Sequence, residues 1–103
     1  MRHILFSLAI LLSPASIAMA QSPDSPIPAV AAQCFSCHGA NGRPTLADVP
    51  IIAGQQPLYL ANALRAYKAG QRTAGRALVM QEMVRGLTDE DIEMLAKWFG
   101  EQK

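Results

Sequence analysis

The side chains with the most distinctive chemistry lie in the short segment AQCFSCHGANGRP, residues 32–44. It contains both cysteines of the chain, Cys34 and Cys37, followed directly by His38. The other histidine of the 103-residue sequence is His3, close to the first residue. Thiol and imidazole groups bind metals and act as nucleophiles, so this segment is the strongest candidate for a functional site.

Four kinds of chemistry use the Cys-x-x-Cys spacing. A Cys34–Cys37 disulfide would close too short a loop to stabilise the chain much. A structural zinc site needs four ligands, and the two thiols and His38 supply three. A thioredoxin-like redox pair is expected beside a βαβ pattern, and no strand-like alternation surrounds this segment. The fourth chemistry is covalent attachment of haem, for which Cys-x-x-Cys-His is the sequence signature.

The spacing explains why this motif suits haem. If residues 27–38 are helical, Cys34, Cys37 and His38 lie at i, i+3 and i+4, on one helix face. The two thiols can each add to one vinyl group of the porphyrin, and the imidazole can reach the iron from the same side. Gly39 ends the helix without a side chain to crowd the ring. We therefore predict one covalent haem c, with thioethers at Cys34 and Cys37 and His38 as the proximal iron ligand.

The N-terminal segment, residues 1–20, has the three-part form of a secretory signal. Arg2 precedes the apolar run Ile4–Leu12, and small residues lead to an expected cleavage point after Ala20. The apolar run is much shorter than the ~20 residues that span a bilayer. No later segment is apolar and long enough to do so. We expect cleavage of this signal and a periplasmic chain with no membrane span.

The remaining chain, residues 21–103, is short and nearly neutral. Without Arg2, its basic residues equal its eight acidic ones, and a nucleic-acid binder would show a basic excess. A chain of this length forms one domain with a modest core, and such domains usually need a disulfide, metal or cofactor. We expect a proline-rich lead at 21–28 and the domain at 29–103.

Hydrophobic periodicity predicts an all-α domain with three main helices. The first ends at Gly39, and 39–50 is loop by its glycine, asparagine and proline content. The second begins at Pro57 and ends at Gly70. The last is capped by Thr88. Apolar stripes run along the second helix (Leu60, Ala63, Leu64, Tyr67) and the last (Ile92, Leu95, Ala96, Phe99).

A second iron ligand must come from a methionine, because His3 leaves with the signal. Methionine is a common partner of histidine at haem iron and raises the reduction potential. The candidates are Met80, Met83 and Met94. Met94 is expected in the core, as flexible filler in a regular helix. Met80 and Met83 follow a loop that could cross the far face of the ring.

Three segments together resemble class I cytochrome c. They are CxxCHG, then PIIAGQQPLYLANALRAYKAGQR, then MQEMVRGLTDEDIEMLAKWF. The sequence is most similar to the short bacterial domains of soluble di-haem cytochromes and of the cytochrome subunit of flavocytochrome c sulfide dehydrogenase. The resemblance covers nearly all of Val30–Phe99. It implies a small cytochrome c fold, with helices and loops wrapped around one haem.

The resemblance also implies roles for individual residues. The family's ligand methionine stands seven residues before the apolar residue that precedes the last helix cap, which is Met80 when counted from Leu87, with Met83 as the fallback. A carbonyl of the 39–50 loop should orient His38. Gln55 and Tyr59 match positions near the haem propionates.

The implied function is transfer of single electrons, without enzymatic activity. One alternative is an electron-transfer subunit of a dehydrogenase, and another is a haem enzyme or gas sensor with an open sixth site. The expected partners are redox proteins, namely a donor dehydrogenase and an acceptor oxidase or cytochrome. A cluster of cations predicts that a partner docks through an acidic surface; its members are Arg65, Lys68, Arg72, Arg76 and Arg85.

Overall fold

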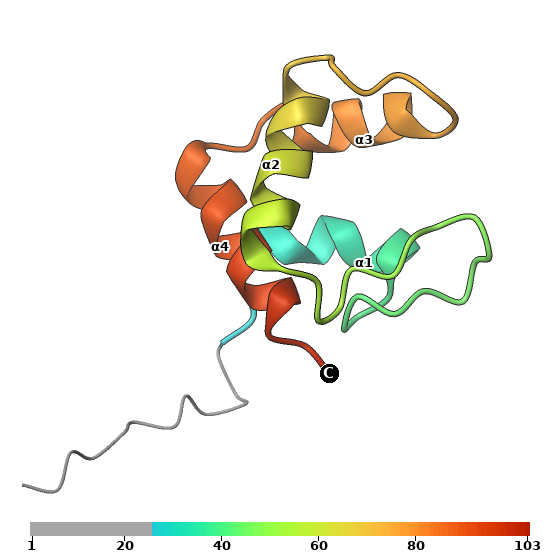
Figure 1. Cartoon of the computed structure of the whole chain (residues 1–103). Coiled ribbons are helices and arrows are strands. Elements are labelled where there is room, and N and C mark those ends of the chain that lie inside the picture. The colour runs from blue at the N-terminus through green and yellow to red at the C-terminus, as the bar shows by residue number, and fades with distance from the viewer. Residues whose placement is uncertain (1–25) are drawn as a thin grey trace, which may run out of the picture.

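The computed structural model describes residues 26–103, and this part of the chain is helical with no strands (Figure 1). A 3-10 turn, η1 (Ala29–Ala31), leads into α1 (Ala32–His38), followed by α2 (Pro57–Lys68), α3 (Ala77–Val84) and α4 (Asp89–Gly100). The all-α prediction is confirmed. The expected signal at 1–20, and most of the proline-rich lead at 21–28, lie outside the described residues.

The predicted starts and ends of the helices largely hold. α2 begins at Pro57, and α1 stops at Gly39, whose φ of 80° suits glycine. Thr88 caps α4 with a full capping box, in which its side chain accepts from the Asp91 amide at 3.1 Å. α3 is not among the helices that the sequence predicts. Its eight residues are mostly apolar on several sides, so they show little helical periodicity.

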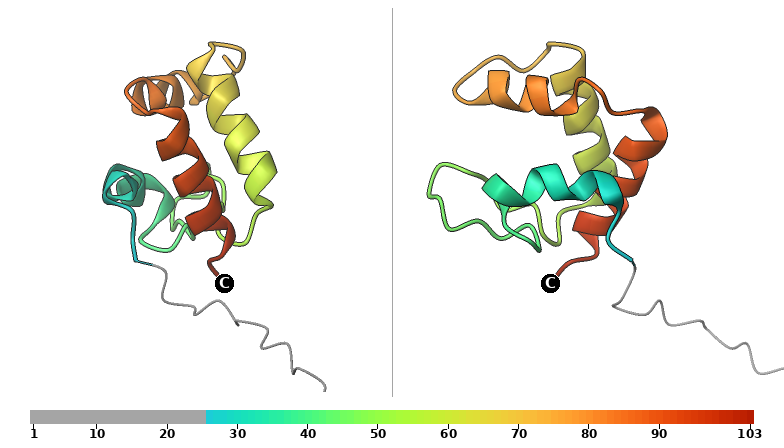
Figure 2. Two further views of the ribbon diagram at one scale, coloured as in Figure 1. Left: turned by 90° about the vertical axis from the view of Figure 1, so that its left-hand side faces the viewer. Right: turned by 180° about the vertical axis from the view of Figure 1, so that it is seen from behind.

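The helices α2 and α4 pack side by side and form one wall of the domain (Figure 2). Leu60 and Ala61 of α2 are buried, and so is the whole predicted stripe of α4 (Ile92, Leu95, Ala96, Phe99). Burial of large aliphatic side chains is the main favourable term at this contact, worth about 1.5–3 kcal/mol each.

The helices α1 and α3 both project from this wall to the same side, and a gap separates them (Figures 1 and 2). Aromatic contacts hold α1 to the end of α4. Phe35 lies 5.8 Å from Trp98 and 6.2 Å from Phe99, between ring centroids, at angles that suit edge and tilted packing. Ala31, just before α1, is fully buried.

The expectation that Met94 belongs to the core is wrong. Its side chain is 47% exposed, whereas Trp98, one turn further along α4, is only 6% exposed. The cause is tertiary: Phe35 of α1 covers Trp98. Helical spacing alone could not show where along α4 that cover ends.

Truncation along α4 should follow this burial. We expect Ile92→Ala to lower the free energy of unfolding by about 2–5 kcal/mol, because Ile92 is fully buried. Met94→Ala is the matched control on the same helix and should change it by less than about 0.5 kcal/mol. Guanidinium denaturation followed by circular dichroism measures both. Equal effects would show that the α4 stripe is placed incorrectly.

Candidate functional site

The space between α1 and α3 is a cavity of about 440 Å³, within the size range of cofactor sites. The α2–α4 wall closes its back, and the 39–56 loop forms part of its floor. Every site residue expected from the sequence lines this one cavity: Cys34, Cys37, His38, Gln55, Tyr59, Met80 and Met83. Side chains far apart in the sequence therefore meet at one place.

The two cysteines lie on the cavity face of α1, one turn apart. Neither forms a disulfide; Cys34 is partly buried and Cys37 is exposed. Burial raises the pKa of the Cys34 thiol, because an apolar environment disfavours the charged thiolate. A neutral thioether meets no such penalty at this position. Within residues 26–103, no three His, Cys, Asp or Glu side chains lie so that they could hold a metal ion by themselves.

His38 is held in one orientation by a loop carbonyl. The imidazole is 7% exposed, and its Nδ1 lies 2.9 Å from the carbonyl oxygen of Pro50. A carbonyl can only accept, so Nδ1 carries the proton and donates. The other ring nitrogen, Nε2, is left with its lone pair free to bind a metal. The predicted orienting carbonyl therefore belongs to Pro50.

The loop that carries Pro50 is itself fixed by backbone hydrogen bonds. The Gly42 carbonyl accepts from the amides of Ile52 at 2.9 Å and Ala53 at 3.1 Å, and the Gly54 amide donates to Phe99 of α4 at 3.0 Å. Gly42 has a φ of 83°, and a Cβ there would lie 2.8 Å from the Ala53 nitrogen. Only glycine fits at position 42 without strain. Gly42 therefore helps to hold the loop whose Pro50 carbonyl orients His38.

The opposite wall of the cavity carries both candidate methionines. Met80 and Met83 lie at i and i+3 on α3, and both are partly buried. Met80 also packs against the hydrophobic core. The cavity is thus lined by thioether side chains from α3 and by the imidazole from α1.

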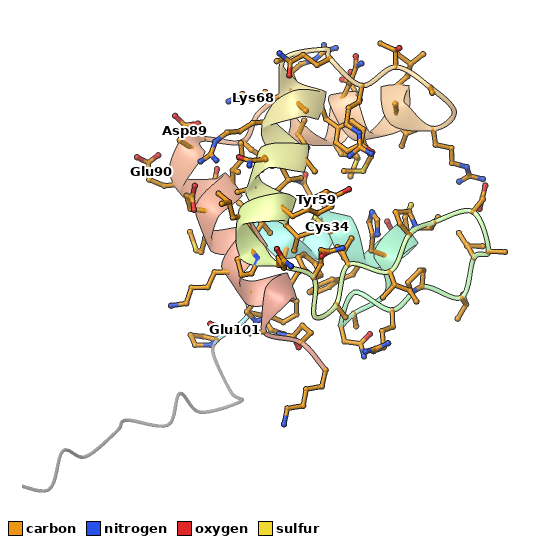
Figure 3. The ribbon with its side chains drawn as sticks, viewed as in Figure 1. Cys34, Tyr59, Lys68, Asp89, Glu90 and Glu101 are labelled. Carbon is orange, nitrogen blue, oxygen red and sulfur yellow. The ribbon has the colours of Figure 1, made fainter. Side chains whose placement is uncertain are left out.

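Gln55 and Tyr59 occupy the open side of the cavity. Tyr59 is 54% exposed and extends from α2 toward the gap between α1 and α3 (Figure 3); like Cys34, it lines the cavity. Gln55 is exposed, and its Oε1 accepts from the Gln56 amide at 2.9 Å. Their predicted role beside the haem propionates stays a prediction.

Part of the site has no signal in the sequence. Helical spacing predicts an apolar stripe along α2; in the structure Leu60 is buried, while Ala63, Leu64 and Tyr67 are partly exposed and line the cavity. Periodicity identifies an apolar face but not whether a helix or a cofactor covers it. Asp48 and Arg76 also line the cavity, on loops whose pairing has no local sequence signal.

Comparison with known proteins agrees with this geometry. Residues 28–102 match the Cytochrome c family, and the chain belongs to it. Cytochrome c-554(548) of Halomonas halodenitrificans is 39% identical over 70 residues, which cover 68% of this chain and 84% of that protein. The cytochrome subunit of sulfide dehydrogenase of Chlorobaculum tepidum is 37% identical over 67 residues, covering 65% of this chain and 57% of that one.

Cytochrome c4 proteins share both sequence and fold with this chain. The Pseudomonas aeruginosa protein is 34% identical over 103 residues, 100% of this chain but 50% of its own length. The crystal structure of reduced recombinant cytochrome c4 from Pseudomonas stutzeri superposes with a TM-score of 0.63 at 32% identity, covering 68% of this chain and 38% of the other. The chain therefore spans about half the length of these relatives.

Family and cavity together define the cofactor and the class of function. The chain binds haem c covalently and transfers electrons, and it is not an enzyme. The donor set fits that group, since two thiols, an oriented imidazole and a thioether sulfur face one apolar slot. Within the described part of the chain, no helix is both long and apolar enough to cross a membrane.

Attachment through both cysteines has a direct test. We expect the haem-loaded wild-type protein to keep its haem stain after denaturing electrophoresis, because thioethers survive unfolding. Cys34→Ala and Cys37→Ala should each retain one bond and a weaker band, and the double variant should lose the stain. Ser36→Ala, between the two thiols, is the control and should stain like wild type. A stained double variant would rule out attachment at these thiols.

Proposed function

We propose that this chain is a periplasmic cytochrome with a single haem that carries one electron at a time, with His38 and Met80 as the axial iron ligands. The observation that carries the proposal is the cavity itself, which His38, oriented by Pro50, and Met80 line from opposite walls. Haem c, when bound, supplies an iron that gains and loses one electron. Two cysteines suffice for one haem attachment site.

The protein side chains then determine how readily the electron leaves. The hydrogen bond from Nδ1 to Pro50 keeps the imidazole in one tautomer and makes it a better ligand. The thioether sulfur of Met80 raises the potential, because it favours the reduced iron. The apolar walls disfavour the extra positive charge of the oxidised state, which acts in the same direction. With both axial positions occupied by protein, a small molecule could reach the iron only while Met80 is displaced.

Met80 and Met83 can be distinguished by paired substitutions. Met80→Ala should open the iron to carbon monoxide and lower the reduction potential, because the sulfur ligand is lost. Met83→Ala should leave carbon monoxide binding unchanged and lower the free energy of unfolding by about 1–3 kcal/mol, as a truncation of a half-buried side chain. Carbon monoxide titration and potentiometry measure both. The reverse pattern would make Met83 the ligand.

The same titration addresses the alternative of a haem enzyme or gas sensor. A wild-type protein that binds carbon monoxide readily in the reduced state would have an open sixth site and would contradict the proposal.

Export and haem number can be tested in one measurement. In a bacterial host with haem-attachment machinery, we expect the protein in the periplasmic fraction, with the mass of residues 21–103 plus one haem. The signal at 1–20 would be absent. A mass that includes residues 1–20, or one without a haem, would contradict the proposal.

A second candidate is an electron-transfer subunit of a dehydrogenase. It is supported by the similarity to the cytochrome subunit of sulfide dehydrogenase. Purification from the native organism separates the two: a free carrier elutes alone, whereas a subunit elutes with its dehydrogenase.

We further propose that the redox partner has an acidic surface. The positive region of this chain that it would contact is smaller than the five cations of the sequence suggest. Three of the five cations have acidic partners: Arg65 pairs with Glu93, Arg76 with Asp48 and Arg85 with Glu82. Lys68 donates to the Leu87 carbonyl, and Arg72 lies 4.6 Å from the Tyr67 ring centroid. Neither contact is to an acidic group, and residues 26–103 place no carboxylate in an ion pair with either side chain, so Lys68 and Arg72 are the proposed centre of the docking region.

A further inference from the structure

One ion pair joins the two walls of the cavity. Asp48 belongs to the loop between α1 and α2, and Arg76 ends the loop between α2 and α3. The Arg76 Nε lies 2.8 Å from the Asp48 Oδ2, and both residues line the cavity. The two loops lie on the side of the domain away from the α2–α4 wall, in the views of Figures 1 and 2.

The ion pair lies at the ends of α1 and α3 that are far from the α2–α4 wall (Figure 1), so it can restrain α3 where that wall does not. Near the start of α1, the Gln33 Nε2 donates to the Met83 carbonyl at the end of α3, at 3.3 Å. The contact between Asp48 and Arg76 joins the two walls again, between the loop after α1 and the residue before α3. The two contacts together join the end of α3 to α1 and the residue before α3 to the loop after α1.

Both residues of the ion pair lie close along the backbone to the residues that orient or supply the proposed iron ligands. The Arg76 carbonyl accepts from the amides of Val79 at 3.0 Å and Met80 at 3.3 Å. Asp48 stands two residues before Pro50, whose carbonyl holds His38. A displacement of Arg76 away from Asp48 would therefore move the first turn of α3, and Met80 with it.

We propose that the Asp48–Arg76 ion pair is a latch that holds α3 over the cavity and limits how often Met80 leaves the iron. Both residues are positioning residues, since neither touches the iron. The inference rests on the proposed ligation by Met80. The side chains are 60% and 59% exposed, so the latch is weak and sensitive to salt.

The test is the rate at which the reduced, haem-loaded protein binds carbon monoxide, because the ligand enters only when Met80 is away. We expect Asp48→Asn and Arg76→Gln each to raise this rate roughly two- to fivefold, the factor that an exposed ion pair supports. The double variant should be no faster than the single ones, because each removes the same interaction.

The pair Arg85–Glu82 provides a matched control. It is somewhat more exposed, at 75% and 66%, with 2.7 Å between the Arg85 Nη2 and the Glu82 Oε2, but it joins two residues of one helical segment and does not cross the cavity. Glu82→Gln and Arg85→Gln should leave the carbon monoxide rate unchanged. Raising the salt to about 1 M, where screening acts over ~3 Å, should speed the wild type toward the latch variants and leave those variants unaffected.

Two results would overturn the latch. Unchanged rates in both variants would show that the contact does not restrain α3. A faster Arg76→Gln with an unchanged Asp48→Asn would show that Arg76 acts on another group, such as a carboxylate of the haem.

A separate readout keeps the latch distinct from the ligand assignment. If Met80→Ala leaves the carbon monoxide rate at the wild-type value, the proposed axial ligand is wrong. Hydrogen exchange of the Met80 amide still reports on α3. Faster exchange in Asp48→Asn and Arg76→Gln, with the Ile92 amide of α4 unchanged, supports the restraint, and unchanged exchange at Met80 contradicts it.

Discussion

The hydrogen bond from His38 to the Pro50 carbonyl is the interaction on which the rest of the site depends. It determines which ring nitrogen carries the proton and which is available to iron. The bond exists because the 39–56 loop folds back under α1, fixed by the Gly42 carbonyl and by the contact of Gly54 with α4. The position of His38 therefore depends on the 39–56 loop as well as on α1.

The apolar side chains of the domain have two different roles. Where α2 meets α4, apolar side chains pack on one another, as they do in any small helical protein. Where α1 faces α3, the apolar side chains instead line a slot of about 440 Å³. A flat, covalently bound cofactor in this slot would add to the burial that a chain of this size achieves alone. The cofactor would then be a structural part of the protein as well as its redox centre.

Local signals in the sequence predicted much of this arrangement. The spacing of Cys34, Cys37 and His38, the cap at Thr88 and the start at Pro57 each depend on neighbouring residues, so the sequence carries them directly. Contacts between segments far apart in the sequence could not be predicted from neighbouring residues. That Pro50 supplies the carbonyl, that Met94 is exposed and that Asp48 meets Arg76 follow from how distant segments pack.

We propose that His38 and Met80 bind one iron from opposite walls of the slot. Proton NMR of the reduced, haem-loaded protein tests this ligation, because a methyl group held over a porphyrin is shifted far upfield by the ring current. We predict that the assigned methyl signal of Met80 shows this shift, while those of Met83 and Met94 stay near ordinary values. An upfield methyl assigned to Met83, or none at all, would contradict ligation by Met80.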